Sequence, residues 1–373
     1  MNAAHLAVFW CLCCALFSGV LVQAKVAAPP AAPSALPPST PAVRDVKPVF
    51  ATAPVATDPD DPAVWINPAD PARSLLIGTN KSALPDGSLY VWDLTGKQKQ
   101  IIPNLDRPNN VDVEYGLDLG NGKTADIVVV TERNKSRLRI FAVATQGLTE
   151  LEPQGGIPVF VGEKKHRAAP MGIGLYKRPR DKAIFAIVGR KSGPASGYLW
   201  QYRLTGDGKG GVQATLVRKF GAYSGRKEIE AVAVDDALGF VYYADERFGI
   251  RKYQADPDSK NADKEVALFG TSGFQADHEG IALWTRPDGT GYVVCTDQIA
   301  GNSEYHLFTR DTKIPREVAV VRGGADETDG IEIVSAPLGP RFPQGLLVVM
   351  NSGPKNFLVY DWRDIAQAVG RKK

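Results

Sequence analysis

The segment Ile229–Gln254 reads IEAVAVDDALGFVYYADERFGIRKYQ, which is three short runs of strand-forming residues separated by tight turns. The runs are IEAVAVD, GFVYYADE and GIRKYQ. Turn residues stand where each run stops, at Asp235-Asp236 with Gly239 and at Arg247-Phe248-Gly249. The same unit recurs along the chain, with starts at about 50-residue spacing, and this recurrence constrains the fold more than any other feature.

The other copies keep the order of the three runs. They contain DDPAVWINP, SLLIGTNK and SLYVWDL; VDVEYGL, DIVVVTER and RLRIFAV; MGIGLYK, AIFAIVGRK and GYLWQYRL; HEGIALWT, GYVVCTDQ and EYHLFTR; and TDGIEIVSA, GLLVVMNS and NFLVYDW. A further β-prone segment, such as QATLVRKF, lies between most copies, so each unit has about four strands. The sequence therefore predicts an all-β protein, a six-bladed β-propeller with four-stranded antiparallel blades. The alternative is an irregular β-sandwich, for which six copies in one strand order would be a coincidence.

The two ends of the repeat region are expected to meet. An open ring would leave strand edges exposed, so the last strand, NFLVYDW, is predicted to pair with an early strand within residues 48–56. The C-terminal segment DIAQAV is the one that looks helical.

The N-terminal part of the chain has a different composition. Residues 1–24 hold the apolar run AVFWCLCCALFSGVLV and end in Val22-Gln23-Ala24, which predicts a signal peptide and a secreted or periplasmic protein. A membrane anchor or a lipoprotein is the alternative, although the run is short for a spanning helix. Residues 25–56 are Ala/Pro-rich and read as a linker, and residues 57–373 as the propeller domain. Loss of the signal would leave Cys295 without a disulfide partner.

The charge balance limits the class of partner. Lys and Arg number 44 against 41 Asp and Glu, a formal net charge of +3. Such a balance argues against nucleic acid or an acidic membrane surface as a partner. A monomer that acts on a small molecule is expected.

Polar residues recur at two positions of the repeat. Because a propeller collects equivalent strand ends on one face, these residues are expected to surround the axis together. First-strand starts carry Asp61, Asp112, Gly172, Glu230, Glu279 and Asp329. Second-strand ends carry Asn80-Lys81, Glu132-Arg133, Arg190-Lys191, Asp245-Glu246, Asp297-Gln298 and Asn351. One side of the ring is thus predicted to be rich in carboxylates and the other in bases.

This distribution points to metal-assisted phosphoryl chemistry. Clustered carboxylates repel one another unless a cation neutralises them, and oxygen ligands suit Ca²⁺. Zinc is disfavoured because His166, His278 and His306 lack ligand spacing. The bases Lys81, Arg133 and Lys191 suit a polyanion that carries phosphates. No C-x5-R loop or G-x-S-x-G elbow is present, so attack by metal-activated water is preferred over a covalent nucleophile.

Several motifs, taken in order, resemble the β-propeller phytases, the alkaline calcium-dependent 3-phytases. They are DDPAVW with TNK, RPNNVD, YYADER, DHEGIALW, GYVVCTDQ and TDGIEI. The resemblance runs from about Asp58 to DWRDIAQAV, so residues 57–373 are expected to be phytase-like. It implies calcium-dependent hydrolysis of phytate (myo-inositol hexakisphosphate) to lower inositol phosphates and phosphate, with several Ca²⁺ ions at a central cleft.

The resemblance also implies roles for individual residues. The ligands of the catalytic calcium cluster would be Asp60, Asp61, Glu230, Glu246, Asp277, Glu279, Gln298 and Asp329. Asn110 and Asp112 resemble further calcium ligands, with a structural ion as one alternative. Substrate phosphates would be bound by Lys81, Arg133 and Lys191. The residues expected to carry catalysis are Asp61, Lys81, Arg133, Lys191 and Glu230.

Some positions depart from the family pattern. Ser82 stands where the family has a second lysine, Ser192 where it has Glu, Met171 where it has a calcium-associated Tyr, and Ala231 where it has Gly. These differences reduce the implied set of ligands and cations. Two other functions stay open: a calcium-stabilised propeller that binds a ligand or protein without catalysis, and a calcium-dependent lactonase.

Overall fold

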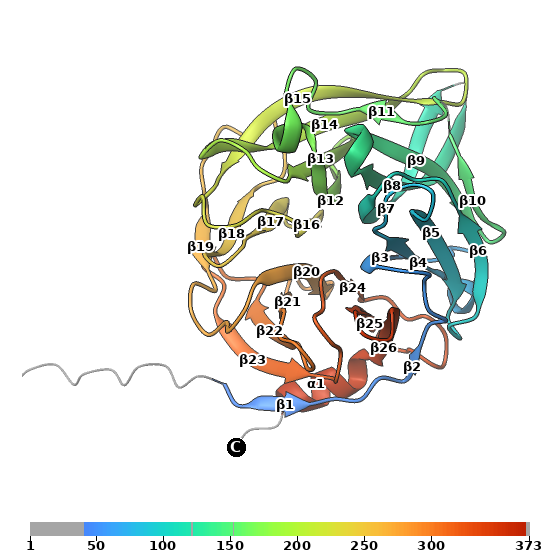
Figure 1. Cartoon of the computed structure of the whole chain (residues 1–373). Helices are drawn as coiled ribbons and strands as arrows, with labels where there is room; N and C mark the ends of the chain where they lie inside the picture. Colours follow the sequence, from blue (N-terminus) through green and yellow to red (C-terminus); the bar gives the residue numbers. More distant parts are fainter. Residues whose placement is uncertain (1–40, 121, 152, 371–373) are drawn as a thin grey trace, which may run out of the picture. The chain divides into compact units, whose positions relative to one another are not determined.

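A computed structural model of the chain describes residues 41–120, 122–151 and 153–370. Six β-sheets are arranged as blades of a ring (Figure 1), so the predicted six-bladed β-propeller is confirmed. The predicted signal peptide, residues 1–24, and residues 25–40 of the predicted linker lie outside the described residues.

The first three blades follow the chain order from the innermost strand outward. Blade 1 contains β3 (Pro59–Trp65), β4 (Leu75–Asn80), β5 (Ser88–Asp93) and β6 (Gln98–Ile102). Blade 2 contains β7 (Pro108–Gly120), β8 (Lys123–Glu132), β9 (Arg137–Ala144) and β10 (Gly147–Glu150), with β11 (Ile157–Pro158) also paired to β9. Blade 3 contains β12 (Pro170–Lys177), β13 (Ile184–Arg190), β14 (Ser196–Gly206) and β15 (Val212–Ala222).

The other three blades repeat this order. Blade 4 contains β16 (Val232–Asp235), β17 (Phe240–Asp245), β18 (Gly249–Gln254) and β19 (Ala267–Phe269). Blade 5 contains β20 (His278–Thr285), β21 (Gly291–Asp297), β22 (Glu304–Thr309) and β23 (Glu317–Arg322). Blade 6 contains β24 (Ile331–Val334), β25 (Leu346–Asn351) and β26 (Asn356–Asp361), with β2 (Phe50–Ala51) as its outer strand. Short 3₁₀ helices are η1 (Pro71–Arg73), η2 (Arg133–Lys135) and η3 (Lys165–Ala168).

The ring closes through the N-terminal strands. Strand β2 pairs antiparallel with β26, with Phe50 opposite Val359, which confirms the predicted pairing of the last strand with residues 48–56. Strand β1 (Val43–Asp45) adds to the outer edge of blade 5 by parallel pairing with β23, a contact that the sequence did not indicate. Both strands precede residue 57 and lie beside β26 and β23 in Figure 1. The two N-terminal strands thus cover the outer edges of blades 5 and 6.

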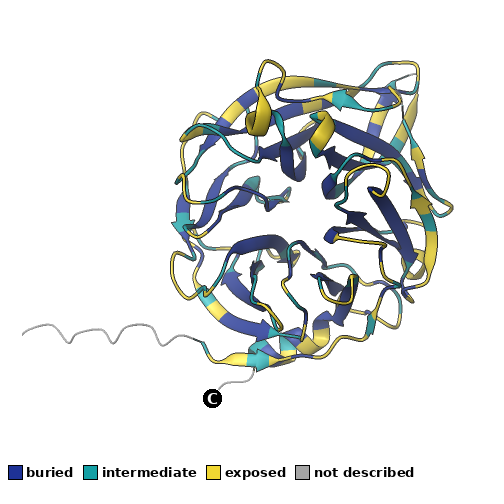
Figure 2. Cartoon of the chain, in the orientation of Figure 1, coloured by how far each residue is buried: buried dark blue, intermediate teal, exposed yellow. Residues whose placement is uncertain are grey.

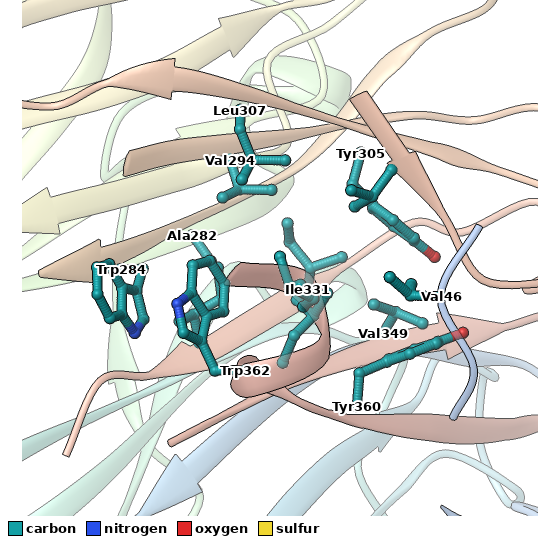
Figure 3. Close-up of a cluster of buried hydrophobic side chains, with 14 of the residues drawn as sticks. Val46, Ala282, Trp284, Val294, Tyr305, Leu307, Ile331, Val349, Tyr360 and Trp362 are labelled. Carbon is teal, nitrogen blue, oxygen red and sulfur yellow. The ribbon is translucent and has the colours of Figure 1, made fainter. Parts of the chain in front are cut away.

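The helix α1 (Trp362–Gly370) packs against blades 5 and 6, and it begins just before the segment predicted to be helical. Trp362 stacks on Trp284 of β20 with ring centroids 4.9 Å apart (Figure 3), and Val46 and Tyr360 belong to the same buried cluster. Among the described residues, no helix is long and apolar enough to cross a membrane.

The second strands of the blades are buried, whereas outer strands expose part of their residues to solvent. All residues of β4, β13 and β25 are buried, whereas β6 carries three exposed residues (Figure 2). Since each blade packs between two others, both faces of its middle strands contact apolar residues, which accounts for their Val, Ile and Leu content. The strand patterns that predicted the repeat are therefore core patterns.

Two glycines allow the inner strands of neighbouring blades to approach closely. A Cβ atom at Gly172 would lie 1.5 Å from the carbonyl oxygen of Glu230. A Cβ atom at Gly330 would lie 2.0 Å from Oδ1 of Asp61. These positions bring residues of separate blades into one constellation at the ring centre.

Candidate functional site

One backbone hydrogen bond recurs in every blade and positions the residue that follows the second strand. That residue donates its N–H to a carbonyl in the loop before the first strand, over 2.7 to 3.1 Å. The donor and acceptor pairs are Lys81 and Asp58, Arg133 and Arg107, Lys191 and Ala169, Glu246 and Glu228, Gln298 and Asp277, and Ser352 and Asp326. We call the six donor residues the entrance ring. Their equivalence agrees with the repeat positions assigned to Lys81, Arg133, Lys191, Glu246 and Gln298 from the sequence.

The residue just before each entrance-ring position holds a loop in place. The side chain of Asp297, for example, accepts hydrogen bonds from the backbone N–H groups of Gln275 (2.6 Å) and Ala276 (2.7 Å). Asn80 accepts in the same way from Asp58 (2.8 Å). These hydrogen bonds fix the loop that precedes the first strand of the same blade. In each polar pair at a second-strand end, the first residue is therefore structural and the second belongs to the entrance ring.

The same hydrogen bonds identify a second ring, formed by residues within two positions of the first-strand starts. In blades 1 to 5 the ring residue follows the residue of the loop carbonyl by two positions. In blade 6 it follows by three, because the loop there contains an extra residue at Glu327, whose φ is 40°. We call this set the inner ring; it consists of Asp60, Asn109, Met171, Glu230, Glu279 and Asp329. Asp61, Asp112 and Gly172, which the sequence predicted at these starts, lie one, three and one residue later than the inner-ring positions of their blades.

Asp61 and Asp112 connect neighbouring blades. Oδ2 of Asp61 accepts a hydrogen bond from the Val111 N–H at 2.9 Å, and Oδ2 of Asp112 accepts one from the Leu175 N–H at 2.7 Å. Burial raises the pKa of Asp112 to about 7 and that of Asp61 well above its usual range. One oxygen of each carboxylate is thus committed to the backbone of the next blade. Of the other predicted ligands, Asn110 accepts a hydrogen bond from Asn109 at 2.7 Å.

A first charged group lies where blade 1 meets blade 6. Nζ of Lys81 pairs with Oδ1 of Asp60 and lies 3.1 Å from Oδ2 of Asp329, whose other oxygen accepts a hydrogen bond from Gln298. Burial raises the pKa of Asp60 well above its usual range, although Lys81 opposes the shift. Burial would lower the pKa of Lys81, but the two aspartates outweigh it and raise that pKa.

Glu230 lies between the bases and the other acids. Its Oε1 accepts a hydrogen bond from Nδ2 of Asn109 and lies 3.9 Å from Nη2 of Arg133. Burial alone would raise the pKa of Glu230, but the positive charges of Lys81 and Arg133 outweigh it and lower the pKa. Glu230 is therefore held as a carboxylate inside the site.

A second charged group joins blades 4 and 5. Nζ of Lys227 lies 2.8 Å from Oε2 of Glu246, 2.6 Å from Oδ2 of Asp277 and 3.2 Å from Oε1 of Glu279. Burial raises the pKa of Glu246 to about 9 and that of Glu279 well above its usual range. At Asp277 burial also acts upward, but hydrogen bonds from Arg247 and Lys227 outweigh it and lower the pKa.

Lys191 lies apart from Lys81 in its contacts. Its Nζ pairs with Oε2 of Glu228, and oxygens of Glu228, Glu230 and Glu246 lie within 4.8 Å of one another. The structure thus brings the predicted ligands Glu230 and Glu246 together.

Sequence reasoning missed Lys227, Glu228 and Asn109. A repeated acid-x-acid pattern could have identified Glu228, because it recurs around the first-strand starts of four blades. The pairs are Asp58 and Asp60, Glu228 and Glu230, Asp277 and Glu279, and Glu327 and Asp329. No comparable pattern marks Lys227, which belongs to the connection between β15 and β16.

A cavity of about 450 Å³ runs along the inner strands of the described blades. Its lining includes Asp60, Asn110, Glu230, Glu279 and Asp329. Predicted ligands from blades 1, 2, 4, 5 and 6 therefore face one space.

The acids of the cavity and of the group around Lys227 fit a hard divalent cation. Within the described part of the chain, Oδ2 of Asp60, Oε1 of Glu246 and Oε2 of Glu279 are buried without a hydrogen-bond partner. A buried carboxylate oxygen without a partner is unfavourable, and a cation would satisfy it. Since the donor set consists of carboxylate and amide oxygens, it suits an oxygen-binding metal better than a soft one.

Comparisons with known proteins identify similar sequences and similar folds. A family model described as Phytase matches residues 20–373. A 3-phytase of Bacillus subtilis (strain 168) is 31% identical over 347 residues, which cover 86% of this chain and 85% of that protein.

Solved structures resemble the chain at lower identity. A protein from Lactobacillus plantarum has a TM-score of 0.51 and 15% identity, with 84% of each chain covered. The calcium-binding protein regucalcin from Agrobacterium tumefaciens str. C58 has a TM-score of 0.49 and 11% identity, with 86% of this chain and 97% of that chain covered. The likeness to the Lactobacillus protein concerns the fold alone.

Proposed function

The chain belongs to the phytase family, and from this membership and the geometry of its site we propose that it hydrolyses phosphomonoester bonds of phytate to inorganic phosphate and lower inositol phosphates. The observation that carries the proposal is the division of the entrance ring. Bases occupy this ring in blades 1 to 3, whereas Glu246, Gln298 and Ser352 occupy it in blades 4 to 6. The inner-ring carboxylates of Glu230, Glu279 and Asp329 line the cavity.

The basic part of the ring suits the substrate. Lys81, Arg133 and Lys191 occupy equivalent positions on consecutive blades, and their side chains are 15%, 10% and 37% exposed. Phytate carries several phosphates on one small ring, so neighbouring cations can contact more than one phosphate at once. A lactone or another neutral ester would not need such a row of bases.

The acidic part suits calcium. We assign the binding of Ca²⁺ ions to Asp60, Glu230, Glu246, Asp277, Glu279, Gln298 and Asp329, with Asp61, Asn110 and Asp112 as further ligands that the family resemblance suggests. Bound calcium would screen the negative charge of the phosphates and lower the pKa of an attacking water.

The protein's own residues bind and orient the substrate. Lys81 and Arg133 stabilise the negative charge that develops on the phosphoryl oxygens, and their positive charges also lower the pKa of Glu230, which stays ionised. Asn109 orients Glu230 through its hydrogen bond. Cys295 is fully buried and burial raises the pKa of its thiol, so it does not offer a nucleophile.

We also propose that the protein is exported and acts as a monomer on this small substrate. Residues 1–24 would direct export and be removed. Residues 25–56 would then lead into the phytase-like propeller of residues 57–373, and strands β1 and β2 from this segment would complete its outer edges.

A paired substitution tests the proposed function. Glu230→Gln keeps the shape of the side chain but removes its charge, and phosphate release from phytate should fall by about 100- to 1,000-fold in kcat. Glu150→Gln is the matched control, because Glu150 is ion-paired with Arg139 at the outer edge of blade 2. Calcium binding without any phosphate release by the wild type would favour a binding propeller. Turnover of a lactone with none of phytate would favour a lactonase.

A further inference from the structure

Lys227 occupies the place that a metal ion would take in the acidic part of the site. An ammonium group has three hydrogen-bond donors, and three different carboxylates, those of Glu246, Asp277 and Glu279, lie 2.6 to 3.2 Å from Nζ. Oxygens of these three acids lie within 4.8 Å of one another, the arrangement that a bound cation requires. The ammonium thus lies at the centre of this group.

The origin of Lys227 differs from that of the substrate-facing bases. Lys81, Arg133 and Lys191 follow the second strands of blades 1 to 3, whereas Lys227 comes from the connection between β15 and β16 and enters the group from the side. Its side chain is 34% exposed, while Glu246 and Glu279 are 0% and 5% exposed. The lysine stem therefore reaches from the surface to a buried set of acids.

The charge and the space of the group both limit metal binding. Lys227 contributes one positive charge to the three carboxylates, and Arg247 contributes a second through Asp277. A calcium ion needs six to eight oxygen ligands at about 2.3 to 2.6 Å, which the three acids cannot provide while an ammonium lies among them. A calcium ion bound next to the Lys227 ammonium, among the same three carboxylates, would also be strongly repelled by its positive charge.

We propose that Lys227 is a built-in cation that replaces one calcium ion among Glu246, Asp277 and Glu279, holding one oxygen of each acid around the point where that ion would lie. This inference rests on the proposed calcium-dependent function. The remaining oxygens Oε1 of Glu246 and Oε2 of Glu279 stay available to calcium, and the chain binds one calcium ion fewer than its carboxylates would accept. Lys227 is a positioning residue, since it acts through the acids and not on the substrate.

The number of calcium ions bound per chain tests this inference without reference to activity. It is measured by isothermal titration calorimetry, and by metal analysis after equilibrium dialysis, on the mature wild type and on three variants. Lys227→Ser, which removes the ammonium, should bind one more calcium ion than the wild type. Lys227→Arg, which keeps a charge, should match the wild type. Lys135→Ser is the control and should also match, because Lys135 pairs with Asp106 (3.3 Å) outside the acidic group.

Equal calcium numbers in the wild type and Lys227→Ser would overturn the inference. If Lys227→Ser does not fold, amine acylation of the wild type followed by mass spectrometry provides the test. Lys227 should react no faster at saturating calcium than in chelator, because the ammonium stays among the acids. Faster acylation with calcium would show that metal displaces the lysine, and would overturn the proposal.

Failure of the proposed function would look different. A wild type that binds calcium but releases no phosphate from phytate contradicts the function, and the comparison of calcium numbers still decides the role of Lys227. If neither the wild type nor Lys227→Ser binds calcium, both proposals fail.

Discussion

Blades 1 to 3 and blades 4 to 6 use the same backbone geometry for opposite chemistry. In all six blades the entrance-ring residue donates its N–H to the loop before the first strand. Its side chain is that of Lys81, Arg133 or Lys191 in the first half of the ring, and of Glu246, Gln298 or Ser352 in the second half. The repeat therefore fixes where a side chain lies, and the asymmetry of residue types around the ring creates a place where an anion and a cation can bind next to each other.

The two halves are also joined by ion pairs. Lys81 of blade 1 contacts Asp329 of blade 6, and Lys191 of blade 3 contacts Glu228 in the loop that precedes blade 4. Bases and acids thus neutralise one another across the boundaries between the halves. Substrate and metal would each replace part of this pairing, so variants at equivalent positions should differ according to which pair they break.

The largest effect in the entrance ring is expected for Lys81→Met. This change should lower kcat/KM for phytate by about 100-fold or more, because in the proposed function it removes a charge that stabilises the phosphoryl oxygens. It also leaves Asp60 and Asp329 without their cation, which should lower the free energy of unfolding by about 3 kcal/mol in chelator. Calcium should restore much of this stability. The measurements are steady-state kinetics and denaturant unfolding with and without calcium.

The matched control for Lys81→Met is Lys135→Met, whose lysine is ion-paired away from the acids. Equal decreases in the free energy of unfolding in the two variants would mean that the contacts of Lys81 with Asp60 and Asp329 contribute no more than an ordinary surface ion pair.

A smaller effect is expected for Lys191→Met. This lysine has an equivalent position, but its side chain is 37% exposed, so solvent weakens its field more than at Lys81. We expect about a tenfold rise in KM with little change in kcat, which corresponds to about 1.4 kcal/mol of binding. The rise should shrink at high salt, where exposed charges are screened. A loss in kcat as large as that of Lys81→Met would show that the two bases act alike.

The smallest effect is expected for Ser352→Ala. Ser352 holds the entrance-ring position of blade 6 but offers neither a base nor an acid, and its backbone N–H keeps its bond to Asp326 in the variant. Activity should stay within about twofold, and the free energy of unfolding within about 0.5 kcal/mol, of the wild type. A large loss of activity would mean that the Ser352 hydroxyl itself carries function, since the backbone position is unchanged in the variant.

Much of the fold followed from the sequence because the repeat is local. Each blade consists of consecutive strands, so the order of strands along Ile229–Gln254 could be extended to the whole ring. The pairing of β2 with β26 also followed, because an open edge is unfavourable. The parallel addition of β1 to β23 did not, since a three-residue strand carries almost no periodic signal.

The site was predicted in part. Residues marked by repeat position, such as Lys81, Glu230 and Glu246, lie in the two rings because equivalent positions recur with the backbone hydrogen bonds. The inner-ring register in blades 1 to 3 depends on hydrogen bonds that strand patterns do not reveal. The sequence therefore predicted Asp61, Asp112 and Gly172 at the positions that Asp60, Asn109 and Met171 occupy. Lys227 comes from a connection between blades, where the repeat gives no position.

The most direct test of calcium-dependent phytate hydrolysis is phosphate release from phytate by the purified mature protein in calcium and in chelator. We predict release with calcium, its loss on chelation and its return when calcium is restored, because the acidic half of the ring needs a cation before the basic half can present a phosphate to water. Undiminished phosphate release in chelator, with the metal shown to be removed, would contradict it.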